Sequence, residues 1–293
     1  MKNYLVYQAY GSTDILHECI YSILSFYKTN PYSNTYIVVY TDSKSYLQSY
    51  LGKKISYQQI DQDRINIWKG KIDFVHRVKI KILQDFILNH EGNLLYTDTD
   101  TLFCSDTSGI YKNIEDGKLY MHQNEGRIGD ENNTIMRKVN RFFKSNVLTE
   151  RIKIPPETIA NLSMYNAGVL GFKTDQKHIL SNSLVFTDSI YPRFPKHIVE
   201  QLAFSLYMQA SGPVYEAKEE IFHYWNFKEF RSVLKVFFEK HHNLSVETLM
   251  ERLDNISPKR LIKPKLAYEK TRGMRRIYQK LIKGKWQMPV YEL

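Results

Sequence analysis

The chain has little cysteine, since its 293 residues include only Cys19 and Cys104, which are far apart and belong to no CxxC pair. Neither a disulfide framework nor a cysteine metal site is therefore expected, and a reducing compartment fits. No stretch approaches the ~18 apolar residues that a membrane span needs, and the first residues hold no signal-peptide core. We expect a soluble, unprocessed, cytoplasmic protein.

Acidic residues are scarce at the end of the sequence. Residues 257–293 contain eleven Lys or Arg and two Glu, a charge of +9, whereas residues 1–256 hold 30 basic and 29 acidic side chains. The same segment has apolar residues at mostly helical spacing: Met274, Ile277, Leu281, Ile282 and Trp286. Such a segment suits an anionic membrane surface. We expect a catalytic body (1–256) followed by a basic helical tail (257–293). The tail would hold the protein on the inner face of the membrane. The alternative is a helix packed on the body.

The body begins with alternating strand and helix patterns. Strands are expected at 3–11, 35–42, 54–60 and 93–98, and helices at 14–29, 44–51 and 74–90. This alternation favours an α/β fold, with a parallel sheet between two layers of helices. Ligands of such sheets bind beyond the carboxyl ends of the strands. Gly11, Asp42 and the pair Asp98 and Asp100 all fall at such ends.

The helix expected at 74–89 carries a lysine on its apolar side. Val75, Val78, Ile82, Leu83 and Phe86 form one apolar arc, and Lys79 falls in the middle of it. Its ammonium either extends past the core to water or enters an anion site, because a buried lysine is costly unless it is paired. Diphosphate would be such a partner.

The stretch "NLLYTDTDTLF" (93–103) places two carboxylates one residue apart after an apolar strand. On the bend past a strand both can converge on one divalent cation and leave positions open for ligand oxygens. Mg²⁺ or Mn²⁺ bound in this way commonly bridges to phosphates. The simpler interpretation is that both aspartates only favour a turn.

Four stretches, in order, resemble the GT-A nucleotide-sugar glycosyltransferases, most closely family 8 and its bacterial relatives. They are "LLYTDTDTLF" with the DxD motif, "MYNAGVLGF" (164–172), "VEQLAF" (199–204) and "IFHYWNF" with His223. The resemblance covers about Tyr4 to Phe230. It implies a GT-A fold, a mixed and mainly parallel sheet flanked by helices, with a nucleotide-binding half (1–105) and an acceptor half (106–256).

The resemblance also implies site residues. Asp98, Asp100 and His223 would bind Mn²⁺ or Mg²⁺, a ligand mixture that manganese tolerates. Glu200 and Gln201 would lie near the anomeric carbon. The residues expected to hold the nucleotide-sugar donor, a UDP-sugar, are Ala9, Tyr10, Gly11, Asp42, Arg77, Lys79, Lys81, Asp98, Thr99, Asn166, Ala167 and Gly168. The acceptor would be a glycan or a lipid-linked sugar, as in cell-surface glycan biosynthesis.

The sequence departs from the family 8 pattern in two places. Glu200-Gln201-Leu202 stands where that family has Asp-Gln-Asp, and His223 is not followed by the usual Gly and Lys-Pro-Trp. Glu200 could serve as the general base of an inverting enzyme. Gln201 could instead be the polar group beneath the anomeric carbon of a retaining enzyme, and we favour retention.

Two other functions compete with this one. "DTDTL" also matches the DxDxT opening of haloacid-dehalogenase phosphatases, in which the first aspartate is a nucleophile; about ninety residues precede it here, and Gly129-Asp130 follows too soon. The basic tail, with Tyr268, Tyr278 and Trp286, could bind nucleic acid. The body is neutral and lacks a nucleic-acid motif, so that partner is not expected.

Overall fold

The computed structural model describes residues 1–130, 133–145, 156–270 and 288. The strands are β1 (Asn3–Gln8), β2 (Tyr36–Thr41), β3 (Ser56–Gln59), β4 (Asn93–Thr97), β5 (Thr101–Phe103), β6 (Leu119–Met121), β7 (Asn124–Arg127), β8 (Ser163–Tyr165), β9 (Val169–Lys173), β10 (Val214–Glu216) and β11 (Ile221–His223). The helices are α1 (Thr13–Thr29), α2 (Lys44–Leu51), α3 (Gln62–Lys69), α4 (Arg77–Asn89), α5 (Ser108–Glu115), α6 (Thr134–Ser145), α7 (Pro156–Asn161), α8 (Lys177–Ile190), α9 (Val199–Ser211), α10 (Phe230–His241), α11 (Val246–Arg252), the 3₁₀ turn η1 (Leu253–Ile256), α12 (Pro258–Leu261) and α13 (Lys263–Lys270).

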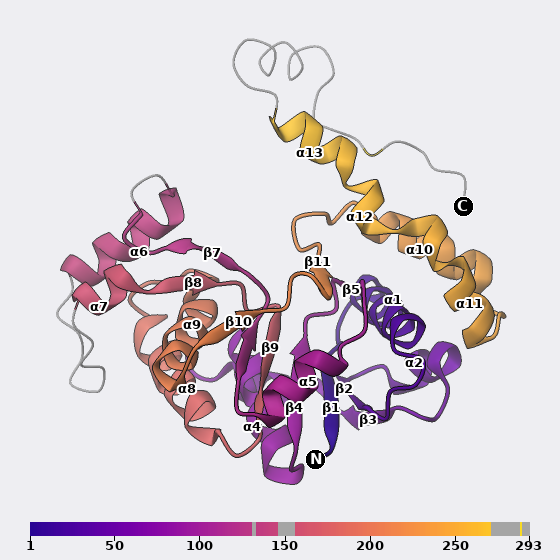
Figure 1. Ribbon diagram of the computed structural model, residues 1–293, viewed down its shortest axis with the longest axis horizontal. Coiled ribbons are helices and arrows are strands. Elements are labelled where there is room, and N and C mark those ends of the chain that lie inside the picture. Colours follow the sequence, from indigo (N-terminus) through magenta and orange to yellow (C-terminus); the bar gives the residue numbers. More distant parts are fainter. Residues whose placement is uncertain (131–132, 146–155, 271–287, 289–293) are drawn as a thin grey trace.

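A seven-stranded sheet forms the centre of the molecule, in the order β10-β6-β9-β4-β1-β2-β3. Its pairs are parallel except where β9 runs antiparallel to both β4 and β6. Helices cover both faces of the sheet (Figure 1). The predicted α/β class, with a mixed and mainly parallel sheet, is confirmed.

The two faces of the sheet bury different side chains of the same strands. Leu5 and Tyr7 of β1 pack in a core cluster with α1, α2 and α10, whereas Tyr4 and Val6 pack in a second cluster with α4 and α8. Successive side chains of a strand point to opposite faces. The four central positions of β1, Tyr4 to Tyr7, are all apolar, and the strand is therefore buried on both sides.

The expected elements of the first hundred residues form, with shifted ends. The helix expected from residue 74 begins at Arg77, and the strand expected over 3–11 ends at Gln8. The sequence reading missed α3, which Asp61 caps by accepting a hydrogen bond from the Arg64 amide at 2.7 Å. An aspartate in the N-cap position is a common helix start.

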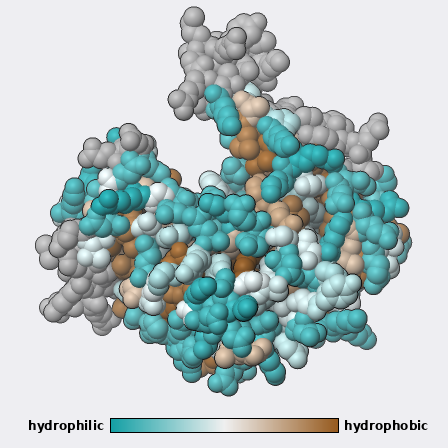
Figure 2. All heavy atoms as spheres, in the orientation of Figure 1, coloured by the Kyte–Doolittle hydropathy of each residue, from teal (hydrophilic) through white to brown (hydrophobic). Residues whose placement is uncertain are grey.

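Two lobes rise from the sheet on either side of β5 and β11. One holds α6, α7, β7 and β8, and the other holds α10 to α13 (Figure 1). Apolar residues gather on this face where the second lobe leaves the body (Figure 2). Ile256, Leu261 and Ile262 belong to the first core cluster, so the body continues past residue 256, where the tail was expected to start.

The C-terminal segment is described through α13, and beyond it only Met288, which packs against the first core cluster. The apolar residues proposed for a membrane-facing helix, Met274, Ile277, Leu281, Ile282 and Trp286, all lie outside the described residues. Within the described residues, no helix has both the length and the apolar character that crossing a bilayer requires.

Candidate active site and metal centre

The bend between β4 and β5 carries the acid pair, and backbone hydrogen bonds fix it from both sides. The Asp98 amide donates to the Gly168 carbonyl at 2.8 Å, and the Tyr224 amide donates to the Asp100 carbonyl at 3.0 Å. β5 pairs antiparallel with β11, which sets Thr101 opposite His223. This pairing brings a histidine from far along the chain to the two aspartates.

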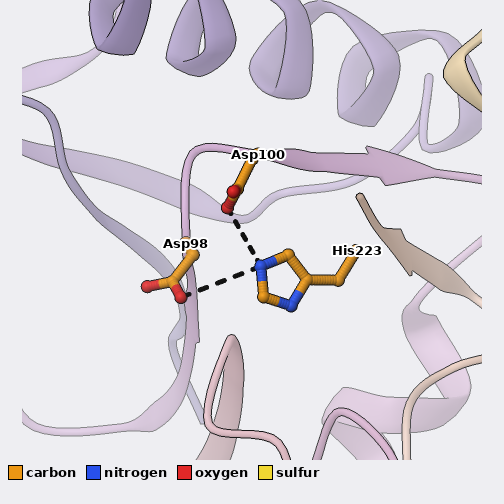
Figure 3. Close-up of side chains that lie close together, drawn as sticks. All are labelled: Asp98, Asp100 and His223. Carbon is orange, nitrogen blue, oxygen red and sulfur yellow. Dashed lines mark hydrogen bonds and ion pairs between the residues drawn. The ribbon is translucent and has the colours of Figure 1, made fainter. Parts of the chain in front are cut away.

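Asp98, Asp100 and His223 present one ligand atom each, and the three atoms lie within 4.8 Å of one another. His223 Nε2 is 2.9 Å from Asp100 Oδ1 and 3.9 Å from Asp98 Oδ2 (Figure 3). Two carboxylates and one imidazole nitrogen are a ligand set that Mn²⁺ accepts. The structure brings together the three metal ligands expected from the sequence.

The other imidazole nitrogen is held by Asn166. Its side-chain Oδ1 lies 3.0 Å from His223 Nδ1 and also accepts the Gly168 amide at 2.9 Å. Because this oxygen can only accept, Nδ1 carries a proton, and Nε2 is the nitrogen that is able to bind a metal. Metal-binding histidines commonly have such a hydrogen-bond partner. The donor set thus fits a divalent cation.

Gly168 is required here by the histidine. A Cβ atom on Gly168 would meet Cε1 and Nδ1 of His223 at 2.3 Å, far inside van der Waals contact. The sequence placed this glycine among the residues expected to hold the donor. In the structure the space beside it is occupied by the imidazole ring.

Neighbouring groups of opposite charge shift the pKa values of Asp100 and His223. Burial alone would raise the pKa of Asp100, but His223 and Lys228 outweigh it and hold that pKa well below the ordinary carboxyl value. Burial alone would lower the pKa of His223, but Asp100 raises it above the ordinary imidazole value. A bound cation would take the place of the Nε2 proton.

Lys79 reaches the same site from α4. Its side chain is 4% exposed, and Nζ lies 3.1 Å from Asp98 Oδ1, 3.2 Å from Glu200 Oε1 and 3.0 Å from the Ala167 carbonyl. Burial would lower the pKa of this ammonium, but the two carboxylates outweigh burial and raise it. Lys79 neither extends to water nor stands free for a ligand anion, because it neutralises two buried acids.

Glu200, at the start of α9, is buried behind Lys79. Burial raises the pKa of its carboxyl to about 7, and Asp98 adds to the effect while Lys79 opposes it. Its Oε1 has no aligned hydrogen-bond partner among the described residues, although the ammonium is close. A carboxylate that is 3% exposed and faces a lysine is poorly placed to take a proton from an acceptor.

Gln201 points elsewhere and shares Glu125 with Asn166. Gln201 Nε2 donates to Glu125 Oε2 at 2.7 Å, and Asn166 Nδ2 donates to Glu125 Oε1 at 3.0 Å. Glu125, on β7, was not foreseen from the sequence. By taking both amide nitrogens, it fixes which way the two side-chain oxygens face.

The ends of β1 and β2 meet at the other side of the site. The Gly11 amide donates to Asp42 Oδ2 at 2.9 Å, and the Ala9 amide donates to the Tyr40 carbonyl at 2.8 Å. A cavity of about 270 Å³ lies between this edge and the metal group. Its lining includes Tyr10, Lys79, Asp98, Thr99 and Asp100, all of them expected site residues.

The structure does not bring Arg77 and Lys81 to this cavity. Arg77 makes two hydrogen bonds to Asp188 of α8, at 2.6 and 3.0 Å, and Lys81 lines a separate cavity with Trp68 and Lys177. Each residue turns a helix by about 100°, so Lys79 points almost opposite to both. The three cations of this helix could not all face one diphosphate.

Three charged residues that the sequence reading missed line the cavity. Lys228, just before α10, places Nζ 2.6 Å from Asp100 Oδ2, and Arg231 pairs with the buried Glu18 at 2.8 Å. Lys228 lies five residues after His223. That spacing on a turn following a metal-ligand strand was a signal available in the sequence.

No protein-family model matches the sequence, and no curated protein matches it. Among solved structures, the glycosyltransferase GlyE of Streptococcus pneumoniae TIGR4 is similar over 86% of this chain and 63% of its own, with TM-score 0.50 and 14% identity. The galactosyltransferase LgtC, solved with donor and acceptor sugar analogues, has TM-score 0.48 and 12% identity over 73% of each chain. Mouse xyloside xylosyltransferase 1 has TM-score 0.47 and 11% identity over 74% of this chain and 85% of its own. The similarity to GlyE confirms the predicted GT-A fold.

Proposed function

We propose that the protein is a metal-dependent glycosyltransferase that moves a sugar from a nucleotide diphosphate donor, a UDP-sugar, to a glycan or lipid-linked acceptor. The observation that carries this proposal is the Asp98, Asp100 and His223 group, placed at the carboxyl ends of the strands of a GT-A fold. GlyE, the solved structure of TM-score 0.50, is named a glycosyltransferase, which supports the assignment.

In this proposal the donor occupies the cavity between the β1 and β2 ends and the metal group. Tyr10, Gly11 and Asp42 hold the base and ribose, and Asp98, Asp100 and His223 hold Mn²⁺ or Mg²⁺. The cation, when bound, neutralises negative charge on the leaving diphosphate. Lys228 lines the same cavity with a half-exposed side chain and is the protein cation that we assign to the phosphates, whereas Arg231 is held by the buried Glu18.

Lys79 keeps two acids of the site, Asp98 and Glu200, in place before a ligand binds. Lys79 compensates Asp98 and Glu200, so the two carboxylates stay close without a bound ligand. A preformed site requires little reorganisation when charge develops on the substrate. We therefore assign Lys79 to holding the acids rather than to binding the diphosphate.

Retention of configuration is the outcome that we propose for the transfer. Glu200 is buried against Lys79, which argues against its acting as the base of an inverting enzyme. Gln201 has its amide nitrogen bound to Glu125, so its Oε1 remains the atom able to face the anomeric carbon. Asn166 to Gly168, adjoining this group, would line the sugar pocket.

The test is a panel of nucleotide sugars, incubated with Mn²⁺ and assayed for hydrolysis and transfer. We expect one UDP-sugar to be hydrolysed by the wild-type chain, and no turnover with Asp100→Asn or with chelator. Phosphate release from a generic phosphoester without need of a nucleotide sugar would support the phosphatase alternative. Failure of every nucleotide sugar to bind would overturn the proposal.

A further inference from the structure

The turn between β11 and α10, residues 224–229, carries Lys228 into the proposed donor cavity. On one side of this turn, Lys228 Nζ lies 2.6 Å from Asp100 Oδ2. Within the turn, the Phe227 amide donates to the Tyr224 carbonyl at 2.8 Å. The amides of Phe230, Arg231 and Ser232 donate to the carbonyls of Phe227, Lys228 and Glu229 at 3.1, 3.2 and 3.2 Å, and so join the turn to α10. The Lys228 side chain is 52% exposed, so packing fixes it only weakly.

A second lysine, from the C-terminal segment, makes hydrogen bonds to the same turn. Lys265 Nζ of α13 donates to the Asn226 carbonyl at 2.6 Å and to Glu229 Oε1 and Oε2 at 3.0 and 2.8 Å. It also lies over the Phe227 ring, 5.9 Å from the centroid. Its side chain is 15% exposed, in contrast to the exposed Lys263 on the same helix. One ammonium thus contacts three of the four residues from 226 to 229.

Charge-assisted hydrogen bonds of this kind are shorter and stronger than neutral ones. The hydrogen bonds from Lys265 act on both sides of Lys228, at the Asn226 carbonyl and at the Glu229 carboxylate, and the contact with the Phe227 ring adds to them. The helix that supplies Lys265 is itself fixed, because Leu261 and Ile262 just before it are buried in the core. The contact therefore transmits the position of the C-terminal segment to the turn.

We propose that Lys265 is a positioning residue for the donor site. By holding residues 226–229 of the turn, it sets the position of the Lys228 ammonium beside Asp100. The proposal rests on the proposed function, in which Lys228 binds the donor diphosphate. It makes residues 257–270 part of the catalytic body rather than the start of a separate tail.

The first test measures the turn itself and needs neither metal nor nucleotide. Hydrogen exchange followed by mass spectrometry should show faster exchange in peptides covering 224–232 for Lys265→Met, and unchanged exchange for the matched control Lys263→Met. Lys265→Arg should restore most of the protection, because guanidinium offers donors to the same carbonyl and carboxylate. Unchanged exchange in Lys265→Met would overturn the proposal.

The second test asks whether the turn acts through Lys228. Calorimetry with UDP and Mn²⁺ should show affinity reduced about three- to tenfold in Lys265→Met, the size expected for a misaligned hydrogen bond to a charged group. In a Lys228→Met background the same substitution should have no further effect. An additive loss, or normal affinity with a loosened turn, would overturn the proposal. Absence of UDP binding to the wild-type chain would instead overturn the proposed function, and exchange would still show whether Lys265 holds the turn.

Discussion

Asn166 Oδ1 lies 3.0 Å from Nδ1 of His223 and sets which of the two imidazole nitrogens faces the aspartates. The contact joins the turn between β8 and β9, which we propose lines the sugar pocket, to His223, the metal ligand that comes last in the sequence. Glu125 holds the asparagine in turn, by accepting from its amide nitrogen. The proposed metal group and the proposed sugar pocket therefore share one hydrogen-bonded network.

Asn166→Ala should weaken Mn²⁺ binding by about 10- to 100-fold, because residues that orient metal ligands commonly contribute that much. The fold should survive, since the side chain lies at the site and not in a core cluster. Titration of Mn²⁺ by electron paramagnetic resonance measures the affinity directly. Unaltered affinity would mean that His223 needs no partner at Nδ1.

Gly168→Ala should also lower Mn²⁺ affinity, through steric displacement of His223. The added methyl group would lie 2.3 Å from two ring atoms, so the imidazole must move away from the aspartates. Gly109→Ala, on α5, is the control, because its methyl group would meet no atom within 4 Å. If both variants bind Mn²⁺ equally well, the close approach of Gly168 to the histidine has no bearing on the metal.

Asp100→Asn should abolish Mn²⁺-dependent UDP binding while leaving the chain folded. The substitution removes one proposed metal ligand and the negative partner of both His223 and Lys228. Isothermal calorimetry measures binding, and circular dichroism checks the fold. Asp116→Asn, at an exposed site after α5, is the control. Wild-type affinity in Asp100→Asn would rule out this metal site.

Lys79→Met should destabilise the protein, because it leaves Asp98 and Glu200 without their cation. Removing one partner from a buried ion pair costs roughly 3–5 kcal/mol. Adding Glu200→Gln should recover part of that loss, since one of the two stranded charges disappears. Urea unfolding near pH 8 measures both changes. A Lys79→Met chain as stable as the wild type would show that the ion pairs contribute nothing net.

Glu200 should make stability depend on pH. The unfolded carboxyl ionises near its ordinary value of 4.5, whereas the folded one keeps its proton to about pH 7, because burial raises its pKa. Folding therefore takes up a proton between these values, and the free energy of unfolding falls as pH rises from about 4.5 to 7. Relative to Glu200→Gln, the wild type should lose roughly 3 kcal/mol across that range. Parallel stability curves for the two chains would contradict the raised pKa.

The sequence predicted what local patterns determine. Strand periodicity and the positions of Gly11, Asp42 and Asp98 indicated the ends of three strands, and those ends do lie at one edge of the sheet. It did not predict Lys228 or Glu125. Lys228 contacts Asp100, 128 residues away, and Glu125 contacts Gln201, 76 residues away. Both contacts depend on how the turn after β11 and the strand β7 fold back to the site. Arg77 and Lys81 were assigned to the donor together with Lys79, although side chains two apart on a helix diverge.

The basic residues after α13 are the remaining candidate for a membrane contact. Residues 271–293 hold six Lys or Arg and one Glu, and each basic residue near an anionic surface contributes about 1 kcal/mol. We expect the full chain to sediment with vesicles containing anionic lipid at low salt, and a chain ending at Lys270 to stay in the supernatant while still hydrolysing its donor. A chain ending at Asn255 should lose donor hydrolysis as well, because it lacks Lys265 and the buried Ile256, Leu261 and Ile262. Vesicles of neutral lipid and a high-salt wash are the controls. Equal sedimentation of the full chain and the chain ending at Lys270 would show that residues 271–293 do not hold the protein at the membrane.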